Sequence, residues 1–241
     1  MENNNAELAR FCIEKIGVPY VMGTNGKKLT KSMYNDLVKR NPSKWFTLAR
    51  RLKVTQWIGK QTTDCHGIIE WFVREQSGAA YDTTANGAFL AATEKGDIKT
   101  IPELLGVCVR FDGHVGVYIG GGYVVEARGF DYGTCLTKLS ARPWTHWYKH
   151  PRIKYTQTAL PAPEPAKVGK ATSRYSVVWL QLALNRQLAA GYIQGTALTV
   201  DGVYGAKTAR VVAEYWRKKN WSKETEVWSV GKNTVKALQK V

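Results

Sequence analysis

Metal-binding patterns are absent from this 241-residue chain, although it has four cysteines and four histidines. No two histidines four positions apart enclose a carboxylate, which disfavours a zinc peptidase of the His-Glu-x-x-His type. The cysteines have no metal-like spacing, and a chain of this size has little need of disulfides in the cytoplasm. We therefore expect no metal and no other cofactor, and we expect Cys12, Cys108 and Cys135 to be structural.

Long apolar runs are also absent. The richest short run, Val177 to Leu184, is far below the roughly 20 residues needed to span a bilayer. The start of the chain, Met1 to Arg10, lacks the basic residues and apolar core of a secretory signal. We therefore expect no signal peptide, synthesis in the cytoplasm and no insertion into a membrane.

Acidic residues are scarce, since 19 Asp and Glu stand against 35 Lys and Arg, for a net charge of +16. Residues 24–60 hold ten basic residues against one aspartate, and residues 173–241 hold eleven against four acidic ones. Such a field favours polyanionic partners. Nucleic acid, an anionic cell wall and a merely solvated surface are all compatible with the charge alone.

The composition predicts a folded protein with two domains. Hydrophobic residues make up 44% of the chain, and its length suits one ordinary domain with a smaller one. Prolines at alternate positions, Pro161, Pro163 and Pro165, are typical of an extended spacer. We expect a first domain at 1–155, a proline-rich linker at 156–172 and a second domain at 173–241.

Apolar periodicity predicts the class of each domain. In the first, helical spacing precedes three strand-like runs, an order typical of an α+β domain. In the second, helical spacing recurs three times, and a short Gly-x-x-Thr pattern is repeated at Gly205 and Gly231, which predicts a small all-α domain of three helices. The strand-like runs are 106–110, 114–119 and 123–127, and the three helices lie at Val177–Leu188, Thr208–Trp216 and Val235–Val241.

Cys65 stands where a helical pattern begins, because Ile68, Ile69 and Phe72 follow it at helical spacing. A thiol in the first helical turn meets unpaired backbone N–H groups and the positive end of the helix dipole, and both lower its pKa. The segment therefore suits a nucleophile. A small buried cysteine that packs beneath Ile69 is an equal alternative from this segment alone.

His114 opens a predicted hairpin. The run His114 to Ile119 and the strand after it are separated by three glycines, so that Gly116 should face Glu126 across the hairpin. Glu126 then lies diagonal to His114 on the same face, within reach of a long side chain. A carboxylate there would fix the tautomer of the imidazole and stabilise the imidazolium. We predict Cys65, His114 and Glu126 as nucleophile, base and orienting acid.

The ordered segments GVPYVMG (17–23), DCHG (64–67), GHVGVY (113–118) and VVEA (124–127) resemble the signature of NlpC/p60 cysteine peptidases over most of residues 6–150. The resemblance implies a papain-like α+β fold. It also implies cleavage of the peptidoglycan stem peptide, often between D-γ-glutamyl and a diamino acid, and it gives substrate-binding positions to Tyr20, Asp64 and His66.

Three features depart from the family pattern. Serine is usual where His66 stands, and His, Asn or Gln is frequent where Glu126 stands. Glutamate in the third place is similar to CHAP amidases and endopeptidases, which stay the alternative. The basic residues 24–60 form an insertion, and their apolar spacing predicts added helices that either form a wall of the substrate groove or cover the domain.

Residues 173–241 resemble the peptidoglycan-binding domains found beside many wall hydrolases. The pattern from Asp201 to Thr208 carries this resemblance, and we expect both of these residues to shape turns and helix starts. Together the resemblances imply a phage endolysin that acts on peptidoglycan after release from the host cytoplasm, and the positive charge makes anionic wall polymers a second expected partner. Nucleic acid is not an expected partner. A non-catalytic wall-binding protein and an acyltransferase or amidase on the same fold stay open.

Overall fold

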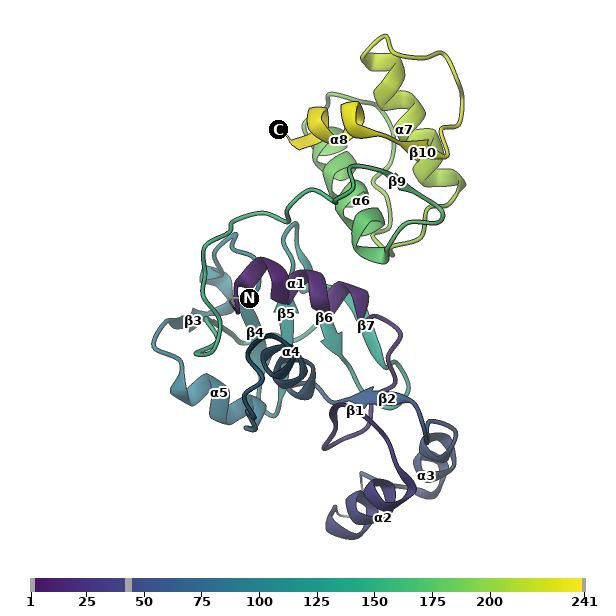
Figure 1. Cartoon of the computed structure of the whole chain (residues 1–241). Helices are drawn as coiled ribbons and strands as arrows, with labels where there is room; N and C mark the ends of the chain where they lie inside the picture. The colour runs from purple at the N-terminus through teal and green to yellow at the C-terminus, as the bar shows by residue number, and fades with distance from the viewer. Residues whose placement is uncertain (1–2, 42–44, 240–241) are drawn as a thin grey trace. The chain divides into compact units, whose positions relative to one another are not determined.

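The computed structural model describes residues 3–41 and 45–239, and the chain forms two compact units, Met1–Ala159 and Leu160–Val241 (Figure 1). Each unit has its own buried core. Val241, which the sequence places on the last helix, lies outside the described residues.

The first unit is built on an antiparallel six-stranded sheet in the order β3-β8-β4-β5-β6-β7, and α1 and α4 lie over one face of it (Figure 1). The predicted α+β class is confirmed, and so are the three predicted strands, which are β4, β5 and β6. The bounds of the elements are α1 Asn5–Glu14, β1 Asn25–Lys28, α2 Lys31–Arg40, α3 Leu48–Thr55, β2 Gln61–Thr63, α4 Gly67–Ser77, α5 Ala85–Ala91, β3 Lys95–Asp97, η1 Ile98–Thr100, β4 Cys108–Phe111, β5 His114–Tyr118, β6 Tyr123–Ala127, β7 Thr134–Lys138, η2 Leu139–Ala141 and β8 His146–Tyr148.

Side-chain caps explain where most of these helices begin. At these starts, the residue before the helix has a side-chain oxygen that accepts a hydrogen bond from a backbone N–H in the first turn, which satisfies a group without an intrahelical partner. Helix α4 is different, because His66 holds the cap position without a side-chain bond and Asp64 accepts the first N–H groups instead. The side-chain caps of the other α-helices in this unit are Asn4, Thr30, Thr47 and Thr84.

The basic insertion forms two short helices, as predicted. Leu37 of α2 and Val54 of α3 are buried in a small core with Tyr20 and Phe130. Leu48, on the other side of α3, is 75% exposed. The insertion therefore packs against the chain beside the predicted site and presents most of its described basic residues to solvent.

The second unit contains α6 Arg174–Ala189, α7 Ala206–Lys218 and α8 Lys232–Gln239, with a two-stranded ladder of β9 Val168–Gly169 and β10 Ser229–Val230. The three predicted helices are confirmed, and the two Gly-x-x-Thr repeats lie at the starts of α7 and α8. The ladder was not predicted from the sequence, because two residues are too few to show a period.

The predicted linker is not a free spacer over its whole length. From Leu160 on, the segment belongs to the second unit. The carbonyl of Leu160 accepts a hydrogen bond from the indole of Trp179, and that of Pro161 accepts one from the hydroxyl of Tyr175. Val168 is fully buried. Leu160 and Pro161 therefore lie against α6, and the boundary falls near residue 160 rather than at 156–172.

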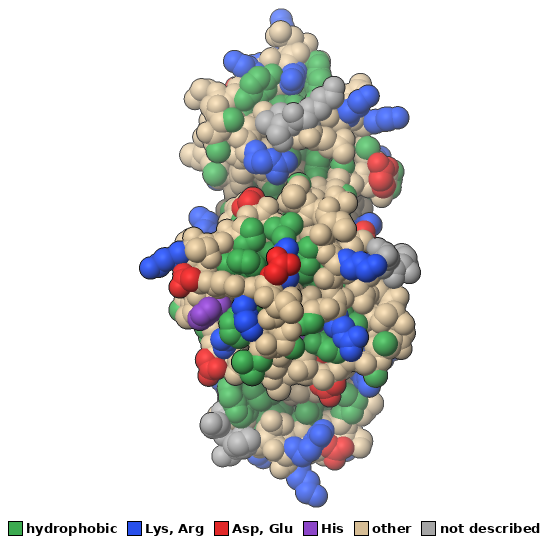
Figure 2. Space-filling view, turned by 90° about the vertical axis from the view of Figure 1, so that its left-hand side faces the viewer, with side chains coloured by type: hydrophobic (Ala, Val, Ile, Leu, Met, Phe, Trp, Pro, Cys, Tyr) green, Lys and Arg blue, Asp and Glu red, His purple; other side chains and the backbone are tan. Residues whose placement is uncertain are grey.

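No helix in the described part of the chain is long and apolar enough to cross a membrane. The face shown in Figure 2 has lysine and arginine side chains spread over it, with fewer acidic ones between them. The positive charge of the sequence is therefore distributed over this face instead of forming one dense patch.

Candidate active site

Cys65 lies between the end of β2 and the start of α4, one residue before the helix cap His66, and not within the first helical turn as the sequence predicted. Its Sγ is 3.9 Å from the carbonyl oxygen of Gly113 and also receives a backbone hydrogen bond from Val115. These two residues flank His114. The fold therefore places the thiol of Cys65 against the beginning of β5, although His114 follows Cys65 by 49 positions in the sequence.

The expected low pKa of the Cys65 thiol is wrong for the free protein. Burial and, after it, the charge of Asp64 raise this pKa to about 12. Backbone N–H groups of Val115, His66 and Cys65 act in the opposite direction, and their effect is smaller. Dehydration of the thiolate outweighs the helix start, so the resting group is a thiol that must lose its proton during attack.

His114 is oriented by Glu126. The predicted hairpin register is confirmed, since Val117 pairs with Val125 and Tyr118 with Val124. The Nε2 atom of His114 lies 2.7 Å from Oε2 of Glu126. A carboxylate can only accept, so Nε2 carries the proton, and Nδ1 of the neutral ring is left as a base.

Glu126 is fully buried, at 0% exposure, and its charge is retained there. Burial alone would raise its pKa, but hydrogen bonds from His114 and Thr137, together with the charges of His114 and Arg142, lower it. Thr137 Oγ1 donates at 2.8 Å and Arg142 Nε at 3.0 Å to Oε1. Thr137 and Arg142 were not predicted, because no spacing rule links a residue beyond β6 to Glu126.

Two aromatic rings confine the imidazole. Phe111 stacks on His114 with ring centroids 4.9 Å apart, and Trp144 lies parallel to it at 5.7 Å. A Cβ added at Gly116 would lie 2.5 Å from Val124 Cγ1 and 3.1 Å from Trp144. Glycine at position 116 is therefore needed for the stacking of Trp144 on His114. From the sequence, this glycine indicated only an open gap beside His114.

A cavity of about 370 Å³ opens over Cys65. This volume is within the range of small-ligand sites. Its walls come from the chain before β1, from both sides of Cys65, from the start of α5 and from the turn before β5. The lining residues are Tyr20, Met22, Gly23, Thr24, Asn25, Asp64, Cys65, His66, Glu70, Asp82, Thr83, Thr84, Ala85, Asn86 and Gly113. Helices α2 and α3 contribute no lining residue among those described, so these helices do not form a wall of this cavity.

Tyr20 and Asp64 both border the cavity, and Asp64 also has a structural task. Its Oδ1 accepts the backbone N–H groups of His66 and Gly67, and its Oδ2 accepts that of Gly23. These bonds fix the turn that presents Cys65. Tyr20 is buried against Phe130, and its aromatic ring lines the cavity.

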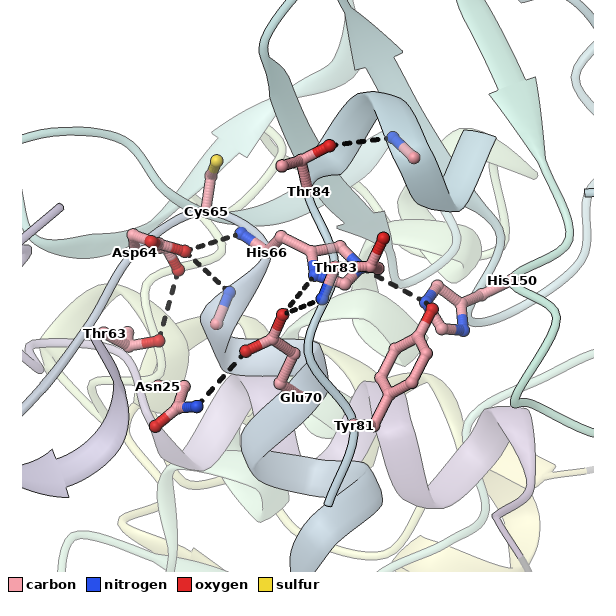
Figure 3. Close-up of polar contacts among 12 residues, drawn as sticks. Asn25, Thr63, Asp64, Cys65, His66, Glu70, Tyr81, Thr83, Thr84 and His150 are labelled. Atoms are coloured by element: carbon pink, nitrogen blue, oxygen red, sulfur yellow. Dashed lines mark hydrogen bonds and ion pairs between the residues drawn. The ribbon is translucent and has the colours of Figure 1, made fainter. Parts of the chain in front are cut away.

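His66 points away from Cys65 into a buried polar network (Figure 3). Its Nδ1 is 3.0 Å from Oε1 of Glu70, and its Nε2 is 3.3 Å from Nε2 of His150. Tyr81 contacts the same nitrogen of His150 at 3.5 Å. Both ring nitrogens of His66 are thus engaged inside the protein, a role that the sequence did not indicate.

The proton positions in this network follow from one backbone bond. The N–H of Arg152 donates to Nδ1 of His150, so the proton of neutral His150 is on Nε2. That proton can be donated to Nε2 of His66, whose own proton is then on Nδ1 and is donated to Glu70. All the donors and acceptors along this line are matched while both histidines are neutral.

Burial, followed by the charges of His66 and Arg152, lowers the pKa of His150 from 6.5 to about 3. Between about pH 3 and pH 6.5, the unfolded chain therefore carries a proton on His150 that the folded protein does not bind. The contribution of this group to the free energy of unfolding is complete above about pH 6.5 and decreases as the pH falls. We expect the free energy of unfolding to decrease by about 1.4 kcal/mol per pH unit through this group. Urea denaturation at pH 7, 6, 5 and 4 measures this slope.

The matched pair for this measurement is His150→Gln and His146→Gln. The first substitution removes the buried imidazole and should flatten the slope whatever it does to stability at pH 7. The second removes a partly buried histidine outside this network and is the control for the loss of an imidazole. Equal slopes in all three proteins would rule out His150 as the source.

No protein-family model matches the chain, and neither does any curated protein. Solved structures do resemble it. NlpC2 from Trichomonas vaginalis is 19% identical with a TM-score of 0.41, over 62% of this chain and 48% of that one. The NlpC/p60 domain of the peptidoglycan hydrolase SagA is 16% identical with a TM-score of 0.38, over 61% and 98%. The peptidoglycan hydrolase RipB from Mycobacterium tuberculosis is 16% identical with a TM-score of 0.40, over 63% and 68%.

The similarity covers about half the length of NlpC2 from Trichomonas vaginalis. Similar structures of this kind include domains described as NlpC/p60 and P60. At these identities and TM-scores, the function of the present chain has to be inferred from its own motifs and from the geometry around Cys65.

Proposed function

We propose that the first unit is a cysteine peptidase of the NlpC/p60 type that hydrolyses an amide bond in the stem peptide of peptidoglycan. The observation that carries this proposal is the buried contact of His114 with Glu126, beside a cysteine at the floor of a cavity. A base whose second nitrogen is held by an ionised carboxylate is the arrangement that nucleophilic acyl transfer requires.

The first step is attack on the amide carbonyl. The thiol of Cys65 transfers its proton to Nδ1 of His114 while Sγ forms a bond to the carbonyl carbon. The imidazolium that results is stabilised by Glu126. The negative charge that develops on the carbonyl oxygen is stabilised by backbone N–H donors at the turn, including that of Cys65.

The second step breaks the carbon–nitrogen bond. His114 returns the proton to the leaving nitrogen, which departs as a free amine, and the acyl group stays on Cys65 as a thioester. A water molecule then attacks this thioester, with His114 again accepting a proton, and the carboxylic acid is released as the thiol is regenerated. Because Cys65 begins as a thiol, proton transfer and attack are coupled, and His114 must be neutral for the reaction to start.

The favoured bond is the one between D-γ-glutamyl and a diamino acid, on the basis of the sequence resemblance. Tyr20 and Asp64 border the cavity at the positions that the resemblance assigns to substrate contact. In the second unit, a wall-binding role would raise the local concentration of substrate without changing the chemistry. Together these assignments describe an endolysin of a phage or prophage, which reaches the wall once the host membrane is opened.

Digestion of purified peptidoglycan tests the proposal. We expect free amino groups to appear without new reducing sugars, and mass spectrometry of the fragments to identify a γ-D-glutamyl bond. Fragments cut at the N-acetylmuramoyl-L-alanine bond would replace the endopeptidase with an amidase. Intact peptidoglycan after prolonged digestion would favour the non-catalytic binding protein.

A further inference from the structure

The second unit contains a cavity of about 650 Å³ that is separate from the candidate active site. It lies between the end of α7 and the start of α8. Among the described residues, its lining combines two indoles with amide groups and one lysine, and includes no acidic residue. The lining residues are Trp216, Asn220, Trp221, Gly231, Lys232, Asn233 and Thr234.

The end of α7 places the two indoles on this cavity. Asn220 adopts a left-handed conformation with φ of 56°, and its N–H donates to the carbonyl of Arg217. The N–H of Trp221 donates to the carbonyl of Trp216 at 2.9 Å. This pair of bonds is a Schellman motif, in which the residue after the turn returns beside the third residue from the helix end. Trp221 therefore lies beside Trp216 because of the backbone.

Both rings are held in place. Trp216 donates its indole N–H to Thr234 Oγ1 at 3.0 Å, which ties α7 to α8. Trp221 meets Tyr215 edge-on, with centroids 6.2 Å apart and an interplanar angle of 85°. Trp221 is nevertheless 45% exposed. A large apolar ring that is fixed in orientation and still exposed has little conformational entropy to lose on binding.

We propose that this cavity binds an amino-sugar chain of peptidoglycan, with one pyranose face on Trp221. A pyranose ring has an apolar face of C–H groups that suits an indole, and its hydroxyl and acetamido groups suit the amides of Asn220 and Asn233. Lys232 provides one positive charge, which fits the lactyl carboxylate of a muramic acid unit that carries no stem peptide. This inference names the ligand that the second unit would bind in its wall-binding role. It rests on the proposed function, because that function makes peptidoglycan the natural source of the sugar chain.

Single-stranded nucleic acid is the other polymer that stacks on exposed aromatic rings. It requires a groove with several cations that follows the phosphates. Lys232 is the one charged residue among the described residues that line the cavity. The lining therefore favours a ligand with few charges over a polyanion.

The experiment uses the full chain and two tetrasaccharides. One is the N-acetylglucosamine tetramer, and the other alternates N-acetylglucosamine with N-acetylmuramic acid. Neither has a stem peptide, so a peptide hydrolase cannot consume them during titration. Calorimetry and the quenching of tryptophan fluorescence report binding. We expect Trp221→Ala to weaken binding of both sugars about tenfold or more, as is usual for a central aromatic contact, and Trp221→Phe to weaken it less.

Trp228→Ala is the matched control. Trp228 belongs to the same unit and is 38% exposed, but it does not line the cavity. The Trp228→Ala variant should bind both sugars with the affinity of the wild type. Lys232→Gln should remove any preference for the sugar with N-acetylmuramic acid. Thermal unfolding of each variant identifies loss of folding.

Equal weakening in Trp221→Ala and Trp228→Ala, or no binding of either sugar by the folded wild type, would overturn the proposal. Binding of an oligonucleotide, but of neither sugar, through Trp221 would overturn it in favour of nucleic acid. Cleavage of soluble stem peptides is measured separately. A chain that binds sugar but cuts no peptide would contradict the proposed peptidase and leave this site standing.

Discussion

Replacing Cys65 with serine or alanine is expected to abolish the release of amino groups from purified peptidoglycan, with a loss of about 10⁴-fold or more in rate. The thiol is the atom that forms the bond to the substrate, and removal of a nucleophile leaves only the contribution of binding and of the oxyanion donors. Serine does not rescue the activity, because its hydroxyl is a far weaker acid than the thiol and the base is a single imidazole. Initial rates at equal protein concentration measure the effect.

The folded state should be almost unaffected by these substitutions. Cys65 makes weak backbone contacts with Gly113 and Val115, and a serine hydroxyl can make both. We therefore expect melting temperatures close to that of the wild type and unchanged sedimentation with insoluble peptidoglycan. Cleavage by a folded Cys65→Ala variant at the wild-type rate would show that another residue is the nucleophile.

Glu126→Gln is expected to lower the rate by about 10² to 10⁴-fold while the shape of the side chain is kept. The carboxylate accepts the proton on Nε2 of His114 and stabilises the imidazolium, whereas an amide can present its NH₂ to the ring and favour the wrong tautomer. Arg142 would also lose its charge partner, so the free energy of unfolding should fall by about 3 kcal/mol. Rates are therefore compared well below the melting temperature of the variant.

Glu103→Gln is the matched control for this substitution. Glu103 is another glutamate of the same unit, where it accepts hydrogen bonds from the hydroxyl of Tyr118 and the N–H of Gly121. It has no contact with His114, and the variant should keep nearly the full rate. Equal rates in Glu126→Gln and the wild type would show that His114 needs no carboxylate, and the proposed role of Glu126 would have to be given up.

The sequence predicted the central hairpin in detail, because three glycines limit the length of its loop and alternation then fixes which residues share a face. His114 and Glu126 could be paired on this basis. The strands β3 and β8 were not predicted, since each has only three residues and they pair with each other from distant parts of the chain. Strand β7 has five residues but no clear apolar alternation, so it was not predicted either. Secondary structure of this kind is determined by the sheet that it joins rather than by its own residues.

The environment of the site was less predictable than its three principal residues. The helix start suggested a low pKa for Cys65, yet dehydration dominates and raises it. His66 stood in a substrate-binding position of the motif, but its ring is directed to Glu70 and His150. His150 lies 84 positions away and Glu70 one helical turn away, so only the folded structure unites them. Burial and long-range contacts are the quantities that a local pattern does not contain.

The intermediate on Cys65 offers the most direct test of the proposed chemistry. A soluble muropeptide is mixed with the wild-type protein, the reaction is stopped with acid after short times, and the intact protein and its peptides are weighed by mass spectrometry. We expect a transient mass increase equal to the acyl part of the substrate, on the peptide that contains Cys65. Consumption of the substrate without any adduct, at an undiminished rate after Cys65 has been alkylated, would contradict the mechanism.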